Sequence, residues 1–374
     1  MRILYLGEDA PHSSSLDRAR ALMRLGHEVA IVNPERGLAS NRVMSALHYR
    51  TGYRFGRNRV RRAVLSAIGE ERFDVVWVDG GRVLDPSVLR LLRKRCHRLV
   101  NYNLDDPFGQ RDGRCWDTFR QSVPEYDLLC VVRVENVREA IALGARRVLR
   151  VWRGYDPAAH SPKSLTAQDR QRLSSEVLFL GTWMSERGAF LVELVNRGLP
   201  LRIYGNRWNK APEWPHLRKH WCGPGLLGDE YVKAIQCARI SLGLVSRGNR
   251  DLHTQRSAEI PYIGSLLCAE RTPEHLRMYR EDCEAVFWQD AEECVRTCHK
   301  LLADEPARKA IAAAGRAKVE RLGVANDLVV EGILSALIHG IEPNHLPSGD
   351  PSTTIAEGLH AWPGLDRATC APVT

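Results

Sequence analysis

Short runs of β-forming residues alternate with helical stretches along most of this 374-residue chain. The first round of the pattern is a buried strand over 2–6, a loop, a helix that begins near Leu16 and stops at Gly26, and a strand over 28–33. Two strands joined through a helix pair in parallel, with a right-handed crossover. The pattern therefore predicts an α/β fold in which helices cover both faces of a parallel sheet.

The same pattern occurs twice. Further β-rich runs of the first series lie at 74–79, 98–103, 127–132 and 146–152. They complete a first doubly wound domain over 1–155, and a stretch with Pro, Ser and Ala over 156–175 is typical of a linker. A second series of strands and helices occupies 176–340, after which residues 341–374 lose periodicity and predict a loosely ordered tail. We expect two Rossmann-like domains facing each other across a cleft, where a ligand site is favoured.

Composition excludes several classes of protein. Hydrophobic residues make up 44% and charged residues 26%, which is ordinary for a globular chain, and no apolar run approaches the ~20 residues that a membrane span needs. The N-terminus lacks the features of a secretion signal, so we expect a cytoplasmic protein. The ten cysteines form no CxxC pair; Cys294 and Cys298, one helical turn apart, favour free thiols over a metal site. No bound metal is predicted.

The formal charge is +9, and part of the excess is local. The segment Arg54–Arg62 packs five arginines into nine positions. Such a patch attracts phosphates, an acidic acceptor or the headgroups of an anionic membrane, or it is simply a solvated face. The sequence leaves these interpretations open.

Polar loops follow two of the strands in the first domain. The loop over 7–15 offers backbone N–H groups to an anion, and His12 and Asp9 could meet a sugar hydroxyl, although an ordinary capped loop explains the same residues. Asp105 and Asp106 follow the strand over 98–103. Paired carboxylates there could bind acceptor hydroxyls, act as a base or hold a metal, or merely cap the next segment.

Two loops of the second domain carry groups suited to a phosphate ligand. In the segment over 179–188, Gly181 allows close backbone approach, and the guanidinium of Arg187 could bind a phosphate or remain a surface arginine. The segment over 247–265 is the richest in charge. Its polar residues before Gly264 are Arg250, Asp251, His253, Arg256 and Glu259. A helix that opens near Arg256 would favour a diphosphate at its N-terminus.

Glu259 is the most informative of these residues because its neighbours are apolar. A buried carboxylate costs several kcal/mol unless a partner satisfies it. The vicinal hydroxyls of a ribose would do so, one turn into the helix. The alternative is a simple pair with Arg256.

Several segments together resemble a known family. In the second half these are "FLGTW", "IYGNRW", "DLHTQRSAEIPYIGSLLCAE" and "EAVFWQDAEECV"; in the first half they are "LDDPF", "YDLLCVV" and "ALGARRVLRVWRGYDPAAHSP". Over about residues 1–335 the chain resembles CgeB-like proteins, which are similar to nucleotide-sugar glycosyltransferases of the family 4 type with the GT-B fold.

The resemblance implies roles for residues of the second domain. The family carries a Glu-x7-Glu element whose second Glu binds the nucleotide ribose, and Glu259, with Gly264 five positions on, matches it. The first Glu falls on Asp251, a shorter acid. The family's diphosphate clamp is an Arg and a Lys after a Gly. Here Gly181 matches, Thr182 replaces the Arg and Arg187 replaces the Lys, so Arg250 or Arg256 would complete the clamp.

The base of the nucleotide would lie near Gly205 and Asn206 and the segment over 223–231. The resemblance then implies a transferase that moves a sugar from a nucleoside diphosphate sugar, with retention of configuration and no covalently bound cofactor. The donor would bind the second domain and the acceptor the first. The candidate catalytic residues are Asp251, His253, Asp106 and His12.

The acceptor stays open: a glycan, a small molecule, a protein or modified DNA. The replacements at Asp251 and Thr182 also fit a non-catalytic assembly protein that keeps the fold. The Arg54–Arg62 segment, with Tyr53 and Phe55 interleaved, fits an enzyme that acts on a modified nucleic acid base.

Overall fold

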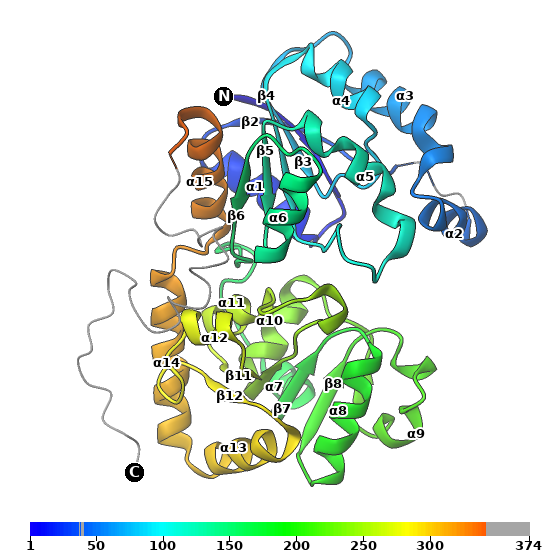
Figure 1. Cartoon of the computed structure of the whole chain (residues 1–374). Helices are drawn as coiled ribbons and strands as arrows, with labels where there is room; N and C mark the ends of the chain where they lie inside the picture. Colours follow the sequence, from blue (N-terminus) through cyan, green and yellow to red (C-terminus); the bar gives the residue numbers. More distant parts are fainter. Residues whose placement is uncertain (37, 39–40, 342–374) are drawn as a thin grey trace. The chain divides into compact units, whose positions relative to one another are not determined.

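The computed structural model describes residues 1–36, 38 and 41–341. The chain forms two compact units (Figure 1). Unit 1 contains residues 1–153, 248–250 and the described residues from 325 onward, and unit 2 contains residues 154–247 and 251–324. Apart from Ile341, the predicted tail lies outside the described residues.

Unit 1 is built on a parallel sheet of six strands in the order β2-β1-β3-β4-β5-β6. Its strands are β1 (Arg2–Leu6), β2 (Glu28–Val32), β3 (Phe73–Asp79), β4 (Cys96–Asn103), β5 (Leu128–Val131) and β6 (Val148–Arg150). Strand β1, which lies between β2 and β3, is buried from Ile3 to Leu6 because helices cover both faces of the sheet, as its continuous apolar run predicts.

Ten helical segments surround this sheet in the described part of unit 1. They are α1 (Ser14–Arg24), α2 (Arg42–Arg50), η1 (Arg54–Gly56), α3 (Arg57–Ile68), α4 (Pro86–Arg93), η2 (Gly113–Trp116), α5 (Asp117–Ser122), η3 (Val123–Glu125), α6 (Val134–Ala142) and α15 (Asn326–His339). The last of them differs from the sequence-based expectation, which placed it in the second domain. Apolar side chains of α15, among them Val330 and Ile333, join the core of Ile3 and Trp77. Its amphipathic pattern shows that the helix must cover a sheet, but not which of the two sheets.

Unit 2 repeats the architecture, with six parallel strands in the order β12-β11-β10-β7-β8-β9. Its strands are β7 (Ser175–Leu180), β8 (Leu201–Tyr204), β9 (Trp221–Gly223), β10 (Ala238–Gly243), β11 (Leu266–Glu270) and β12 (Val286–Trp288). Only β9 was not predicted, because its sequence Trp-Cys-Gly lacks the apolar β-forming run that marks the equally short β12. The predicted α/β class with two Rossmann-like domains is confirmed.

The helical segments of unit 2 lie where helical patterns were expected, with one addition. They are α7 (Ala167–Leu173), α8 (Ser185–Asn196), η4 (Trp208–Lys210), α9 (Trp214–Leu217), α10 (Gly228–Gln236), η5 (Arg247–Asn249, whose last two residues belong to unit 1), α11 (Arg256–Ile263), α12 (Pro273–Met278), α13 (Ala291–Ala303) and α14 (Glu305–Arg321). The addition is α7, which lies within the predicted linker and begins with a capping box between Thr166 and Asp169. In the described residues, no helix combines the length and apolar character that crossing a membrane requires.

Candidate functional site

Three loops meet at the carboxyl ends of β7, β8 and β9 in unit 2. The amide of Gly181 donates to the carbonyl of Tyr204 at 3.0 Å, and the amide of Trp183 donates to the carbonyl of Asn206 at 3.0 Å. The side-chain oxygen of Asn206 accepts from the amide of Gly225 at 3.2 Å. The structure therefore brings together Gly181 and Asn206, which the sequence analysis assigned to phosphate and base binding.

Gly205 is required by the close approach of two of these loops. A Cβ atom at this position would lie 1.8 Å from the carbonyl oxygen of Gly181, which is backbone and cannot swing aside. The same carbonyl accepts a hydrogen bond from the indole of Trp208 at 2.9 Å. The absence of a side chain at Gly205 thus sets the spacing of the loops.

We expect Gly205→Ala to lower the free energy of unfolding of unit 2 by about 1–3 kcal/mol or more, because one of the two loops must move. Gly225→Ala is the matched control, since its Cβ would meet the Asn206 side chain at an ordinary 3.5 Å. Thermal unfolding of both variants measures the difference. Equal melting temperatures would contradict the close approach.

Arg187 lies in the first turn of α8 and bridges two strand ends. Its guanidinium donates to the carbonyl of Thr182 at 3.2 Å and to the carbonyl of Leu244, just past β10, at 3.4 Å. The guanidinium carbon lies 6.0 Å from the centre of the Phe179 ring. The predicted phosphate ligand Arg187 is thus half-buried at the carboxyl edge of the sheet.

Glu259 is buried in the first turn of α11, with 5% of its surface exposed. Its Oε2 accepts a hydrogen bond from the hydroxyl of Tyr231 at 2.5 Å, and its Oε1 lies 3.6 Å from Nε2 of His160. Burial, together with the neighbouring carboxylate, raises the pKa of Tyr231, so the hydroxyl remains protonated and donates. The sequence analysis offered a ribose or Arg256 as partners for this acid; in the structure its side chain contacts Tyr231 and His160 instead.

Arg256 lies beside this pair and keeps donors available. Its guanidinium carbon lies 5.4 Å from the centre of the Tyr231 ring, and its buried Nε has no hydrogen-bond partner among the described residues. The amides of Ser257 and Ala258 donate to carbonyls of the preceding turn. Within the described chain, the amides of Gln255 and Arg256 make no hydrogen bond. This end of α11 therefore presents N–H groups and a cation, as an anion site requires.

Three further residues of the predicted site lie in different surroundings: Gly264, Asp251 and His253. Gly264 ends α11 with a φ of 109°, where a side chain would be strained. Asp251 is buried, and its amide donates to the carbonyl of Ser246 at 3.1 Å. His253 has no exposed surface, and its Nδ1 lies 2.5 Å from Oε2 of Glu274 in α12. Its imidazole therefore links the loop before α11 to α12 and does not reach solvent.

Asp106 and Arg250 meet within unit 1, although 144 residues separate them. Arg250 donates to both oxygens of Asp106 at 2.7 Å and to both oxygens of Glu139 at 2.8 and 2.9 Å. Burial opposes ionisation of Asp106, but hydrogen bonds from Arg250 and Asn136 prevail and lower its pKa. Asp106 and Arg250 therefore neutralise each other in this structure. Asp106 is not free to act as a base, and Arg250 is not free to bind a phosphate.

His12 lies in the loop after β1. It is exposed and has a φ of 66°, in the left-handed region. Its neighbour Asp9 accepts from Asn33 at 2.8 Å and pairs with Arg36. Of the two residues considered for sugar contacts, His12 is thus the accessible one.

A buried ion pair in unit 1 was missed by the sequence analysis. Arg18 donates to both oxygens of Asp79 at 2.7 and 2.8 Å, and the hydroxyl of Tyr5 donates to Asp79 at 2.6 Å. The side chains of Arg18 and Asp79 are 5% and 9% exposed. The one available signal was an acid at the carboxyl end of a predicted strand. Likewise, no sequence pattern pointed to Tyr231 or His160 as partners of Glu259.

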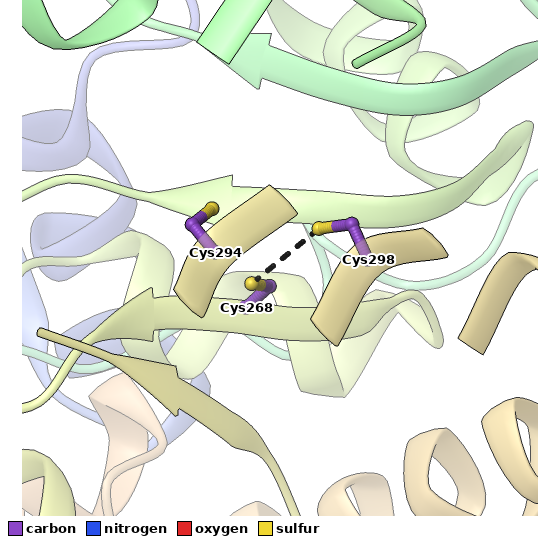
Figure 2. A group of neighbouring side chains, drawn as sticks. All are labelled: Cys268, Cys294 and Cys298. Carbon is purple, nitrogen blue, oxygen red and sulfur yellow. Dashed lines mark hydrogen bonds between the residues drawn. The ribbon is translucent and has the colours of Figure 1, made fainter. Parts of the chain in front are cut away.

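Among the described residues, a single cluster has enough neighbouring side chains to hold a metal ion, and it consists of three cysteines. Cys268 on β11 faces Cys294 and Cys298 on α13, with all three sulfurs within 4.8 Å of one another (Figure 2). Thiolates suit a soft metal ion, but all three cysteines are buried among apolar core side chains, and burial opposes the formation of several thiolates together. The sequence spacing indicated only two of them, because Cys268 comes from another element.

Two units, each with six parallel strands and flanking helices, are the architecture of the GT-B fold. Residues 186–323 match the family model described as glycosyl transferase-like. A search among curated proteins finds no match.

Solved structures share the fold at low identity. The chain is similar to HepE from Anabaena in complex with UDP-glucose (TM-score 0.61, 12% identity, covering 90% of this chain and 99% of that one). It is also similar to sucrose-phosphate synthase from Thermosynechococcus elongatus (0.64, 10%, 91% and 100%). A third similar structure is an α-glucosyltransferase in complex with UDP-glucose and DNA containing an abasic site (0.61, 10%, 90% and 98%).

Proposed function

We propose that the protein is a glycosyltransferase that takes a sugar from a UDP-sugar bound to unit 2. The observation that carries the proposal is the position of Glu259. It is a buried acid in the first turn of α11, beside a cation and unused amides, within the region that matches the glycosyltransferase-like model. The narrower resemblance to CgeB-like proteins stays a prediction.

The donor site follows from the groups at the carboxyl edge of the sheet in unit 2. Arg187, Arg256 and the amides at the start of α11 bind the diphosphate, and Glu259 accepts hydrogen bonds from the ribose hydroxyls. The loops at Gly205 and Asn206 hold the base. To accept from a ribose, Glu259 uses the lone pairs that Tyr231 leaves open, because a carboxylate has about four acceptor sites.

The same groups supply the chemistry of transfer. When the bond between the sugar and the diphosphate breaks, negative charge develops on the leaving phosphate. Two guanidinium groups and the N-terminus of a helix stabilise that charge without a metal ion. We propose retention of anomeric configuration, and Asp251 as the acid nearest the donor sugar.

The remaining catalytic candidates receive different roles. His12, exposed in the loop after β1, stays a candidate for contact with the acceptor. His253 receives a positioning role, because its buried imidazole contacts Glu274 and holds the loop before α11 against α12. Asp106 and Arg250 position the segment over 248–250 in unit 1.

UDP is expected to stabilise the protein against heat. A ligand that binds only the folded state adds about 2.7 kcal/mol at a hundredfold excess over its dissociation constant. Thermal unfolding with UDP, ADP and GDP, each with and without EDTA, measures this and tests metal independence. If none of the three raises the melting temperature, the donor site is not where we place it.

Two alternatives remain distinct in their outcomes. A non-catalytic assembly protein would bind UDP but release none from any UDP-sugar, in a screen that detects the freed diphosphate. An enzyme acting on a modified nucleic acid base would transfer sugar to such a base and to no glycan, protein or small molecule. The presence or absence of transfer, and the class of acceptor that receives the sugar, therefore separate the proposed function from both alternatives.

A further inference from the structure

Residues 41–69 form a segment without acidic side chains on the surface of unit 1. They contain seven arginines and no lysine, aspartate or glutamate. They make up α2, η1 and α3, drawn in blue in Figure 1. The arginines are Arg42, Arg50, Arg54, Arg57, Arg59, Arg61 and Arg62.

None of these seven arginines pairs with a carboxylate in the described part of the chain. Six of them are exposed, and Arg57, which donates to Thr118 and Gln121, is half-buried. Arginines elsewhere in unit 1 do form such pairs: Arg18–Asp79, Arg24–Asp327, Arg82–Glu35, Arg90–Glu125, Arg93–Asp127 and Arg120–Asp117. The segment thus concentrates positive charge that the protein itself does not neutralise.

Large apolar side chains are exposed on the same segment. Val43 is 76% exposed, Phe55 59% and Leu47 41%. Val43 and Leu47 are one turn apart on α2, so they share a face of that helix. The guanidinium carbon of Arg54 lies 4.6 Å from the centre of the Phe55 ring. Apolar and cationic groups are therefore interleaved.

We propose that this surface, α2 with η1 and α3, docks the protein on an anionic membrane. Apolar side chains gain by entering the boundary between headgroups and acyl chains, while arginines stay at the lipid phosphates. Nucleic acid would satisfy the arginines, and Phe55 could stack on a base. Nucleic acid, however, offers no apolar environment for the exposed side chains of Val43 and Leu47. The proposal does not depend on the donor site, because docking needs no nucleotide.

Sedimentation of the full chain with vesicles tests the charge component. We expect binding to vesicles of phosphatidylglycerol and phosphatidylcholine, but not to phosphatidylcholine alone. Arg59→Gln, Arg61→Gln and Arg62→Gln combined should weaken binding roughly a hundredfold, at about fivefold per charge. The matched control removes the same charge at three exposed arginines outside the segment: Arg138→Gln, Arg170→Gln and Arg218→Gln.

A second pair of variants tests the apolar component at constant charge. Val43→Ser with Leu47→Ser should weaken vesicle binding by about tenfold. The control is Ile141→Ser with Leu276→Ser, at exposed apolar side chains in α6 and α12. Since all four positions are exposed, thermal unfolding should be nearly unchanged.

Three outcomes would overturn the proposal. They are no binding to anionic vesicles at low salt, binding that the Val43 and Leu47 variant leaves intact, and tighter binding to duplex or single-stranded DNA than to the vesicles. UDP stabilisation is measured separately. A failed donor site and a failed docking surface therefore give different results.

Discussion

Glu259→Ala is expected to weaken UDP binding on the order of a hundredfold. The carboxylate would lose two hydrogen bonds from ribose hydroxyls, and a hydrogen bond to a charged group contributes about 1.5–3 kcal/mol. Two such bonds at the lower value amount to about 3 kcal/mol, hence the two decades in the dissociation constant. Isothermal titration of UDP into the wild type and the variant measures the change.

Tyr231→Phe separates ribose binding from a purely structural role. It removes the hydroxyl that donates to Glu259 at 2.5 Å and keeps the carboxylate for the ligand. We expect a modest loss of stability and UDP binding within about tenfold of the wild type. If Glu259→Ala lowers only the melting temperature and leaves UDP affinity unchanged, the acid is structural and the proposed donor site is wrong.

Asp79→Ala is expected to destabilise unit 1 by about 3–5 kcal/mol, because it leaves the buried guanidinium of Arg18 without its carboxylate. The expected loss is confined to unit 1, so a local measurement separates it from the stability of unit 2. Hydrogen exchange of β1 and β3, the strands beside this pair, reports the local loss directly. Glu125→Ala is the control, since its partner Arg90 is 68% exposed and such pairs contribute about 0–1 kcal/mol.

A double replacement tests the physical reason. Arg18→Met with Asp79→Leu removes both charges together and should recover much of the stability lost by Asp79→Ala. An arginine side chain is not deprotonated in proteins, so the guanidinium of Arg18 remains charged when its partner is removed. If the double variant is as unstable as Asp79→Ala, the loss comes from packing and not from an unpaired charge.

Local patterns were enough to predict the two sheets. The continuous apolar runs of β1 and β3, and the helical periodicity between them, reflect interactions between residues close in sequence. The start of α11 near Arg256 was also predicted from local sequence. Its end at Gly264 was not predicted, although a glycine with left-handed backbone is a local signal for the end of a helix. The carboxyl-edge positions of Gly181, Arg187, Gly205 and Asn206 follow from the rule for parallel sheets.

Side-chain partners could not be predicted in the same way. Arg250 was expected to bind a phosphate and Asp106 an acceptor, yet they bind each other across 144 positions. A charged residue carries no mark of its partner, because the energy of an ion pair depends on distance and burial, which only the folded chain defines. The same holds for His253 with Glu274 and for Cys268 with the two cysteines of α13.

The sequence by itself determined the fold class, the strand–helix alternation of both units and the loops in which a donor site belongs, because periodicity, caps and glycine positions act over a few residues. The tertiary structure alone decided which charges are neutralised, which stay available, and that α15 covers the sheet of unit 1. These outcomes depend on contacts between distant residues, and their energies are set by burial rather than by neighbours in the chain.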